Sequence, residues 1–174
     1  MIEIIAGTNR EGSVTAQVAR YYQGGLLAEN QTCKLLELAS LPPDFTVSAL
    51  YENAGKNPQF NTLVSRLQKA EKFVFVVPEY NGSFPGVLKA FIDGMPYPSP
   101  FSGKKCALVG LSSGVQGGNL ALSHLTDIFN YLGMHVLAQK VRLAHIENHY
   151  RNEEFSNSLY ASLLKQQIKA LIDF

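Results

Sequence analysis

Length, composition and charge place this chain among ordinary globular proteins. It has 174 residues, of which 46% are hydrophobic and 17% are charged, and its net charge is +1. This length suits a single domain, 1–174, with a sizeable core, and the near-neutral charge argues against a nucleic-acid partner. No apolar run approaches the ~20 residues that a membrane-spanning helix needs, so we expect no membrane partner.

Two features of the chain indicate the cytoplasm. The apolar segment Met1–Gly7 is short and lacks a basic leader, so it predicts a first strand and not a signal peptide. Cys33 and Cys106 stand in apolar contexts without a C-x-x-C pattern. This pattern predicts two small buried thiols in preference to a disulfide or a redox pair.

Strand-like and helix-like segments alternate along the chain. In chain order we predict a strand at Met1–Ala6, a helix at Ser13–Glu29, a strand at Cys33–Leu38, a helix at Asn57–Ala70, a strand at Phe73–Val77, a helix at Pro85–Met95, a strand at Lys105–Leu111, a helix at Asn119–Leu132, a strand at His135–Leu137 and a helix at Ser156–Asp173. The segment Leu41–Lys56 has little periodicity and is expected to be a loop.

Strands that alternate with helices in this way predict a three-layer α/β/α sandwich around a five-stranded parallel sheet. At this length we expect a flavodoxin-like fold with the strand order 2-1-3-4-5. In such open sheets the ligand lies at the carboxyl edge, where the loops after strands one, three and four meet. Those three loops are also the ones with unusual composition.

The loop after the first strand, Gly7–Thr15, has the composition of an anion site. Thr8, Ser13 and Thr15 offer hydroxyls, Arg10 offers a guanidinium, and the helix start offers free backbone N–H groups. Ser13 stands where a Walker A loop needs Lys, and position 9 lacks the Gly of a dinucleotide-binding G-x-G-x-x-G pattern. An ordinary Ser-capped helix start explains this loop equally well.

The loop after the third strand, Pro78–Phe84, favours a site for a flat ring. Its backbone N–H groups, the Asn81 amide and the Tyr80 ring suit the edge and the face of a heterocycle. The alternative is a rigid loop whose Tyr80 and Phe84 only pack. The position of the loop at the switch point of the sheet favours binding.

The loop after the fourth strand, Ser112–Asn119, contains three glycines that let its backbone approach a planar ligand. It also completes Gly110-Leu111-Ser112-Ser113-Gly114, which matches the G-x-S-x-G nucleophile elbow and raises a serine hydrolase using Ser112 as a competing hypothesis. An elbow turns into its helix at the serine, whereas this loop continues to Asn119. Potential triad partners follow in the required chain order, at Asp127, His135, His145 and His149.

A metal site is not expected. His145 and His149 are four residues apart and could share a helix face, but no third ligand is evident.

Taken together, the three loops resemble the NADPH-dependent FMN reductase family of flavodoxin-like proteins, which includes quinone, azo-dye and chromate reductases. The second loop carries the most specific match, in Pro78-Glu79-Tyr80-Asn81, Ser83, Pro85-Gly86, Leu88-Lys89 and Ile92-Asp93. The first loop is similar to the family's G-S-x-R-x-x-S-x-N segment, with matches at Gly7, Arg10 and Ser13, Thr8 in place of Ser, and Thr15 where Asn is common. The resemblance covers the chain from Met1 to about Leu143.

The resemblance implies that FMN is bound without a covalent bond. The phosphate would be held by Thr8, Arg10, Ser13 and Thr15. The isoalloxazine would be lined by Pro78, Glu79, Tyr80, Asn81 and Gly82, with Ser112 and Gly114 on its other border. The implied activity is that of an NAD(P)H oxidoreductase, in which hydride passes from the nicotinamide through flavin N5 to a quinone-like, azo or similar acceptor. No side chain needs to act as a catalytic acid or base.

The resemblance also implies a homodimer or homotetramer and a small-molecule electron acceptor. Two departures bear on the subunit packing and the substrate pocket: Gly94 stands where a Trp is common, and Leu41–Lys56 has no clear counterpart. A flavodoxin-type electron carrier is the alternative function, although such carriers dock through strongly acidic surfaces and this chain has a net charge of +1. The sequence assigns no basic contact that would select NADPH over NADH.

Overall fold

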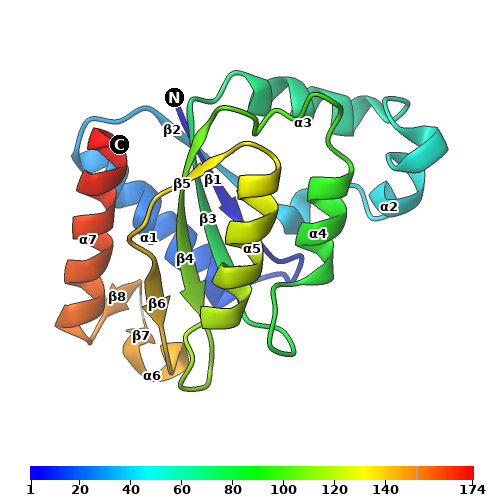
Figure 1. Ribbon diagram of the computed structural model, residues 1–174. Helices are drawn as coiled ribbons and strands as arrows, with labels where there is room; N and C mark the ends of the chain where they lie inside the picture. Colours follow the sequence, from blue (N-terminus) through cyan, green and yellow to red (C-terminus); the bar gives the residue numbers. More distant parts are fainter. Residues whose placement is uncertain (152) are drawn as a thin grey trace.

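A parallel sheet forms the middle layer of the protein (Figure 1). The computed structural model describes residues 1–151 and 153–174. The strands follow the spatial order β2-β1-β3-β4-β5, and their bounds are β1 Ile2–Ala6, β2 Cys33–Glu37, β3 Lys72–Pro78, β4 Lys105–Leu111 and β5 His135–Val136. The predicted three-layer fold and its 2-1-3-4-5 strand order are confirmed.

Helices cover both faces of the sheet because its central strands are apolar on both sides. One face packs against α1 (Val14–Ala28) and α7 (Ser158–Asp173). The other packs against α3 (Pro58–Gln68), α4 (Gly86–Asp93) and α5 (Asn119–Tyr131), as Figure 1 shows. The five predicted helices are therefore confirmed, with ends that shift by less than one turn.

Polar caps set the starts of two of these helices. The Ser13 hydroxyl accepts a hydrogen bond from the Ala16 amide at 3.2 Å, and the Asn57 side-chain oxygen accepts one from the Phe60 amide at 3.0 Å. Each bond satisfies one of the amides that a helix leaves free in its first turn.

The last strand of the sheet is interrupted, which the sequence did not indicate. After β5, the chain leaves β4 and returns to it as β6 (Val141–Leu143). The side chain of Gln167 on α7 fills the interruption, since its amide donates to Leu108 O at 3.0 Å and to Gln139 O at 2.8 Å. A side chain thus supplies the donor that a continuous strand would have supplied.

The predicted loop Leu41–Lys56 contains two short helical segments, α2 (Phe45–Ser48) and a 3-10 turn at Tyr51–Asn53. Tertiary packing explains them, because the buried ring of Phe45 stacks on Phe60 of α3 at a centroid distance of 5.9 Å. Leu50 is also buried there.

Gly94 lies beside this packed segment. A Cβ built on Gly94 would lie 2.8 Å from Phe60 Cζ and 3.2 Å from Leu50 Cδ1. The space that a larger side chain at position 94 would need is therefore filled by α3 and by the segment after β2. The two departures from the family pattern, Gly94 and Leu41–Lys56, thus form one structural feature.

Short elements between β6 and α7 were also absent from the sequence prediction. They are α6 (Ile146–His149) and a two-stranded ribbon of β7 (Tyr150–Arg151) and β8 (Glu154–Phe155). The ribbon packs on α1 through edge-to-face contacts of Tyr21 with Tyr150 and Phe155. Aromatic packing, which local sequence patterns do not report, holds this segment in place.

Cys106 is buried, as expected, whereas Cys33 is only half-buried, and both are free thiols. Burial raises the pKa of the Cys106 thiol to about 12, so this thiol is protonated and unreactive at neutral pH. Along residues 1–151 and 153–174, no helix has the length and apolarity required to cross a bilayer.

A buried ion pair joins β1 to α3. Glu3 is fully buried in β1, and its two carboxylate oxygens accept hydrogen bonds from Arg66 Nε at 2.8 Å and Nη2 at 2.5 Å. Arg66 Nη2 also donates to the Leu35 carbonyl of β2 at 3.1 Å. One guanidinium therefore ties α3 to two neighbouring strands through charge-assisted bonds.

We expect Arg66→Met to lower the free energy of unfolding by about 3–5 kcal/mol, because it leaves the Glu3 carboxylate buried without a partner. The matched control is Arg20→Met, whose partner Glu37 lies on the surface, and it should cost at most about 1 kcal/mol. Urea denaturation measures both. Equal costs for the two variants would show that the buried pair contributes no more than the exposed one.

Candidate functional site

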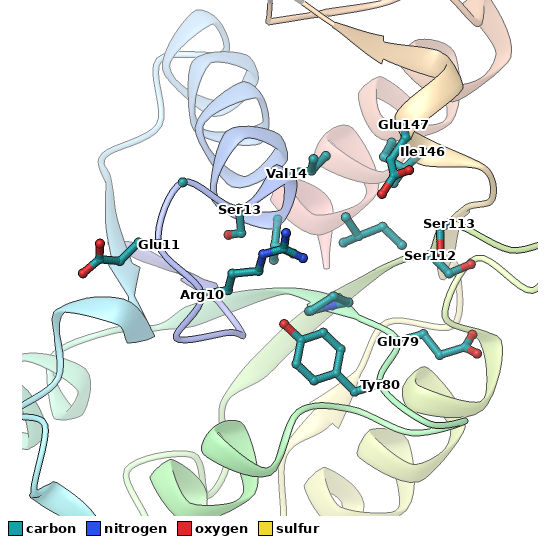
Figure 2. Close-up of a pocket in the computed structure, with 14 residues that line it drawn as sticks. Arg10, Glu11, Ser13, Val14, Glu79, Tyr80, Ser112, Ser113, Ile146 and Glu147 are labelled. Carbon is teal, nitrogen blue, oxygen red and sulfur yellow. The ribbon is translucent and has the colours of Figure 1, made fainter.

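A cavity of about 250 Å³ lies at the carboxyl edge of the sheet, where three loops meet (Figure 2). We call them loop A (7–13, after β1), loop B (79–85, after β3) and loop C (112–118, after β4). Most of the predicted site residues line this cavity, namely Arg10, Ser13, Thr15, Pro78, Glu79, Tyr80 and Ser112. The structure thus brings residues far apart in the sequence to one place, as the strand order requires.

Four predicted site residues lie next to the cavity without lining it: Thr8, Asn81, Gly82 and Gly114. Thr8 is a buried residue within loop A. Asn81 and Gly82 form the turn that follows Tyr80, and Gly114 lies in loop C just after the lining residue Ser113.

Loop A forms the cationic end of the cavity. Figure 2 shows the Arg10 side chain reaching toward the middle of the cavity, while Glu11 points away from it. Within the chain that the structure describes, the amides of Val14 and Thr15 have no acceptor, as helix geometry requires of the first turn. A guanidinium and two free amides at a helix N-terminus suit a phosphate group.

A hydrogen bond couples loop A to loop B. The Thr8 hydroxyl lies 3.0 Å from the Tyr80 hydroxyl and accepts a bond from the Arg10 amide at 3.3 Å. Thr8 is only 2% exposed, so its hydroxyl acts inside the protein. It holds the Arg10 backbone and the Tyr80 ring in a fixed relation.

Loop B is a tight hairpin turn. Tyr80 and Ser83 exchange backbone hydrogen bonds of 2.8 and 3.0 Å, and Asn81 and Gly82 between them have φ values of 51° and 73°. Asn-Gly is the preferred pair for a turn with two positive φ angles. The amides of Glu79 and Tyr80 are already used within the protein, so among the described residues the free donors of this turn are those of Asn81 and Gly82.

Loop C folds back on the end of its own strand. A Cβ on Gly110 would lie 2.6 Å from the Gly117 carbonyl oxygen, and a Cβ on Gly118 would lie 3.0 Å from Gly110 Cα. Gly118 also has a φ of 80°. Glycine is required at both positions because backbone touches backbone there.

The hydroxyl of Ser112 is part of this loop. It donates to the Gly114 carbonyl at 2.9 Å and accepts from the Gly117 amide at 2.9 Å. In the described chain no histidine bonds to it, and α5 begins only at Asn119. Ser112 therefore lacks both the base and the sharp strand-to-helix turn of a nucleophile elbow.

The helix α6 adds a wall that the sequence did not predict. Ile146 and Glu147 line the cavity, and Figure 2 shows the Glu147 carboxylate facing it opposite loop B. The His145 amide bonds to Gly114 O at 3.1 Å, its Nδ1 lies 3.0 Å from Ser113 O, and the Ile146 amide bonds to Ser112 O at 3.1 Å. These contacts join α6 to loop C, and no local sequence pattern predicts them.

The two histidines considered as metal ligands flank this wall. His145 precedes α6 and His149 ends it. Among residues 1–151 and 153–174 there is no group of three side chains that could hold a metal ion.

A protein family and several known proteins are similar to this chain in sequence. The model of the family described as NADPH-dependent FMN reductase matches residues 1–148. An NAD(P)H-dependent FMN reductase of Pseudomonas aeruginosa is 30% identical over 172 residues, which cover 96% of this chain and 90% of that protein. A quinone reductase of Escherichia coli is 30% identical over 135 residues, with 76% and 71% coverage. An FMN-dependent NADPH-azoreductase of Staphylococcus saprophyticus is 30% identical over 132 residues, with 74% and 69% coverage.

Solved structures show the same fold. FerB, a flavoenzyme NAD(P)H:(acceptor) oxidoreductase from Paracoccus denitrificans, superposes with a TM-score of 0.78 at 24% identity, covering 99% of this chain and 94% of its own. The apo form of an NADH:FMN oxidoreductase gives a TM-score of 0.77 at 22% identity, with 98% and 87% coverage. At these identities the structural similarity supports a shared flavodoxin-like fold and nothing beyond the fold.

We expect Ser112→Ala to destabilise the protein by about 1–2 kcal/mol, since it removes two hydrogen bonds and leaves the Gly117 amide unpaired. Ser113→Ala is the matched control, because its hydroxyl makes no hydrogen bond within the part of the chain that is described. Thermal and urea unfolding measure both. If the two variants proved equally stable, Ser112 would not hold loop C.

Proposed function

The chain belongs to the NADPH-dependent FMN reductase family, and we propose that its cavity at loops A, B and C is the flavin site of a single FMN-binding domain, 1–174. Membership in this family makes the protein an oxidoreductase that uses FMN with NAD(P)H as the co-substrate. The observation that carries the site assignment is the convergence of an anion-binding end and an aromatic end in one cavity.

The phosphate end is assigned to loop A and the start of α1. Arg10 supplies charge, the amides of Val14 and Thr15 supply free donors, and the hydroxyls of Ser13 and Thr15 line the same wall. A phosphate dianion gains from all of these groups and from the positive end of the helix dipole. Thr8 serves here as a positioning residue, because its hydroxyl is held by Tyr80 and Arg10.

The ring end is assigned to loops B and C. Pro78, Glu79 and Tyr80 line the cavity on one side and Ser112 on the other, while Asn81, Gly82 and Gly114 supply the adjoining backbone. FMN, when bound, supplies the redox chemistry, since it takes up hydride and passes electrons on. Pro78, Glu79, Tyr80 and Ser112 would contact the ring, and the free amides of Asn81 and Gly82 would offer backbone donors beside it. No side chain of the site needs to act as a catalytic acid or base.

We further propose that the acceptor is a flat, quinone-like or azo aromatic. Exposed apolar side chains lie at Tyr80 in the cavity wall, at Val115 in loop C and at Leu120 at the start of α5, and they suit an uncharged aromatic molecule better than an ionic one. The matched relatives named quinone reductase and azoreductase support this choice. The free thiols Cys33 and Cys106 support a reducing compartment, so we place the protein in the cytoplasm.

A homodimer is the proposed assembly, formed through a groove of about 520 Å³ between α4 and α5. The groove is mostly apolar, and Tyr97 and Tyr131 at its border are 100% and 90% exposed. Lys89 on α4 pairs with Asp93 at 2.7 Å, and Asp127 lies on α5, so a two-fold axis can bring the exposed Lys89 near the carboxylate of a second copy. The apolar lining and these charges support a second copy of the chain as the occupant of the groove.

We expect Arg10→Gln to weaken FMN binding about tenfold or more, because a charge-assisted bond to phosphate is lost. Riboflavin, which lacks the phosphate, should bind the variant and the wild type alike. Flavin fluorescence titration measures both ligands, with Arg20→Gln on the outer face of α1 as the control. An unchanged preference for FMN over riboflavin in Arg10→Gln contradicts the phosphate assignment.

Purified protein with FMN should oxidise NADPH or NADH in the presence of a benzoquinone or an azo dye. The readout is the loss of absorbance of the reduced nicotinamide. A protein that binds FMN but reduces neither type of acceptor would contradict the proposed acceptor class.

Light scattering should give a dimer mass for the wild type and a monomer mass for Tyr131→Asp, because a charge placed in an apolar interface is costly to bury. Tyr51→Asp is the matched control, since Tyr51 is 80% exposed and lies outside the groove. A monomeric wild type would rule out this assembly.

A further inference from the structure

A second polar cavity lies along α5 and the side of the sheet formed by β5 and β6, and it begins at Asn119, directly after loop C. Its volume is about 430 Å³, and it is formed between α5 and the interrupted edge strand. Its polar residues are Asn119, Ser123, Thr126 and Asp127 from α5, Arg142 from β6, and Lys140 from the segment that joins β5 to β6. Figure 1 shows β6 beside β4, with α5 on the other side of β4 in this view.

Two cations line this cavity from neighbouring positions in the chain. Arg142 lies on β6 and Lys140 directly precedes β6, and both border the cavity. Neither has a carboxylate within ion-pair distance among the described residues. Their charge is therefore available to an external anion.

The cavity holds one of these cations in a prepared position. Arg142 Nη1 donates to the Asn119 side-chain oxygen at 3.2 Å, which leaves its other N–H groups for a ligand. Ser123 is exposed on α5. Asp127 opposes the cations, but two positive groups against one carboxylate leave the cavity with a net positive charge.

Loop C connects this cavity to the flavin site. Ser112 and Ser113 at its start line the first cavity, and Asn119, which follows its end, lines the second. The edge strand makes the same connection, because Arg142 pairs with Gly110 in register and Ile146 lines the first cavity. A dinucleotide with one end over the flavin would cross loop C to reach the second cavity.

We propose that this second cavity binds the 2′-phosphate of NADPH, with Lys140 and Arg142 as its specificity-determining residues. The inference rests on the proposed function of the first cavity. NADH carries a hydroxyl where NADPH carries a phosphate dianion, so two cations at this place favour NADPH and contribute little to NADH. The protein then prefers NADPH because of a site that does not touch the nicotinamide.

Edge strands also carry Lys and Arg to prevent pairing with other chains. Under that explanation the two charges matter for solubility and leave the choice between NADPH and NADH unaffected. Kinetic and binding measurements separate the two explanations.

The kinetic test compares kcat/KM for NADPH and for NADH in the wild type and in Lys140→Gln/Arg142→Gln, at saturating FMN and with a benzoquinone acceptor. We expect the NADPH value to fall about tenfold or more, because charge-assisted bonds to a phosphate are lost, and the NADH value to stay unchanged. Lys169→Gln, an exposed cation on α7, is the control. Equal changes for both coenzymes, or none, would overturn the proposal.

The second readout does not depend on catalysis. Calorimetric titration with adenosine 2′,5′-bisphosphate and with AMP measures the contribution of the 2′-phosphate alone. We expect the wild type to prefer the bisphosphate and the double variant to lose that preference. A wild type that does not distinguish the two nucleotides overturns the proposal, even if it binds FMN. A wild type that prefers the bisphosphate but fails to bind FMN supports the second cavity and removes the proposed function of the first.

Discussion

Backbone packed directly on backbone at the end of β4 is the constraint on which the site depends. Loop C can lie against its own strand only because Gly110 and Gly118 carry no Cβ where the two segments touch. This contact places Ser112 and Ser113 at one cavity and Asn119 at the other. A side chain at either glycine would move the loop that separates and shapes both cavities.

The other two loops are fixed by hydrogen bonds instead of close packing. The Thr8 and Tyr80 hydroxyls join loop A to loop B, and the Glu79 amide joins loop B to the end of β4 through Leu111 O at 2.9 Å. The wall of the cavity is therefore one connected network that is present before any ligand binds. A preorganised site loses little conformational entropy on binding, which favours a cofactor held without a covalent bond.

The same region also shows how this chain differs from its family pattern without losing the fold. The segment after β2 folds over α3, and Phe45 and Leu50 fill the space near Gly94. Side chains from α3 and from the segment after β2 thus occupy the volume next to position 94. Cores tolerate exchanges of side chains when the total volume is kept.

The order of the sheet was expected from the fold class and the chain length. Local patterns in the sequence determined the alternation of strands and helices and the three loops that carry Arg10, Tyr80 and Ser112. Each of these depends on residues close together in the chain: apolar runs, helix caps, and Gly or Pro at turns. Only the tertiary structure decided the wall at Ile146 and Glu147, the interrupted edge strand with its two cations, and the helical segment at Phe45–Ser48. These features depend on contacts between distant segments, such as Gln167 with Leu108, and such contacts leave no periodic signal in the sequence.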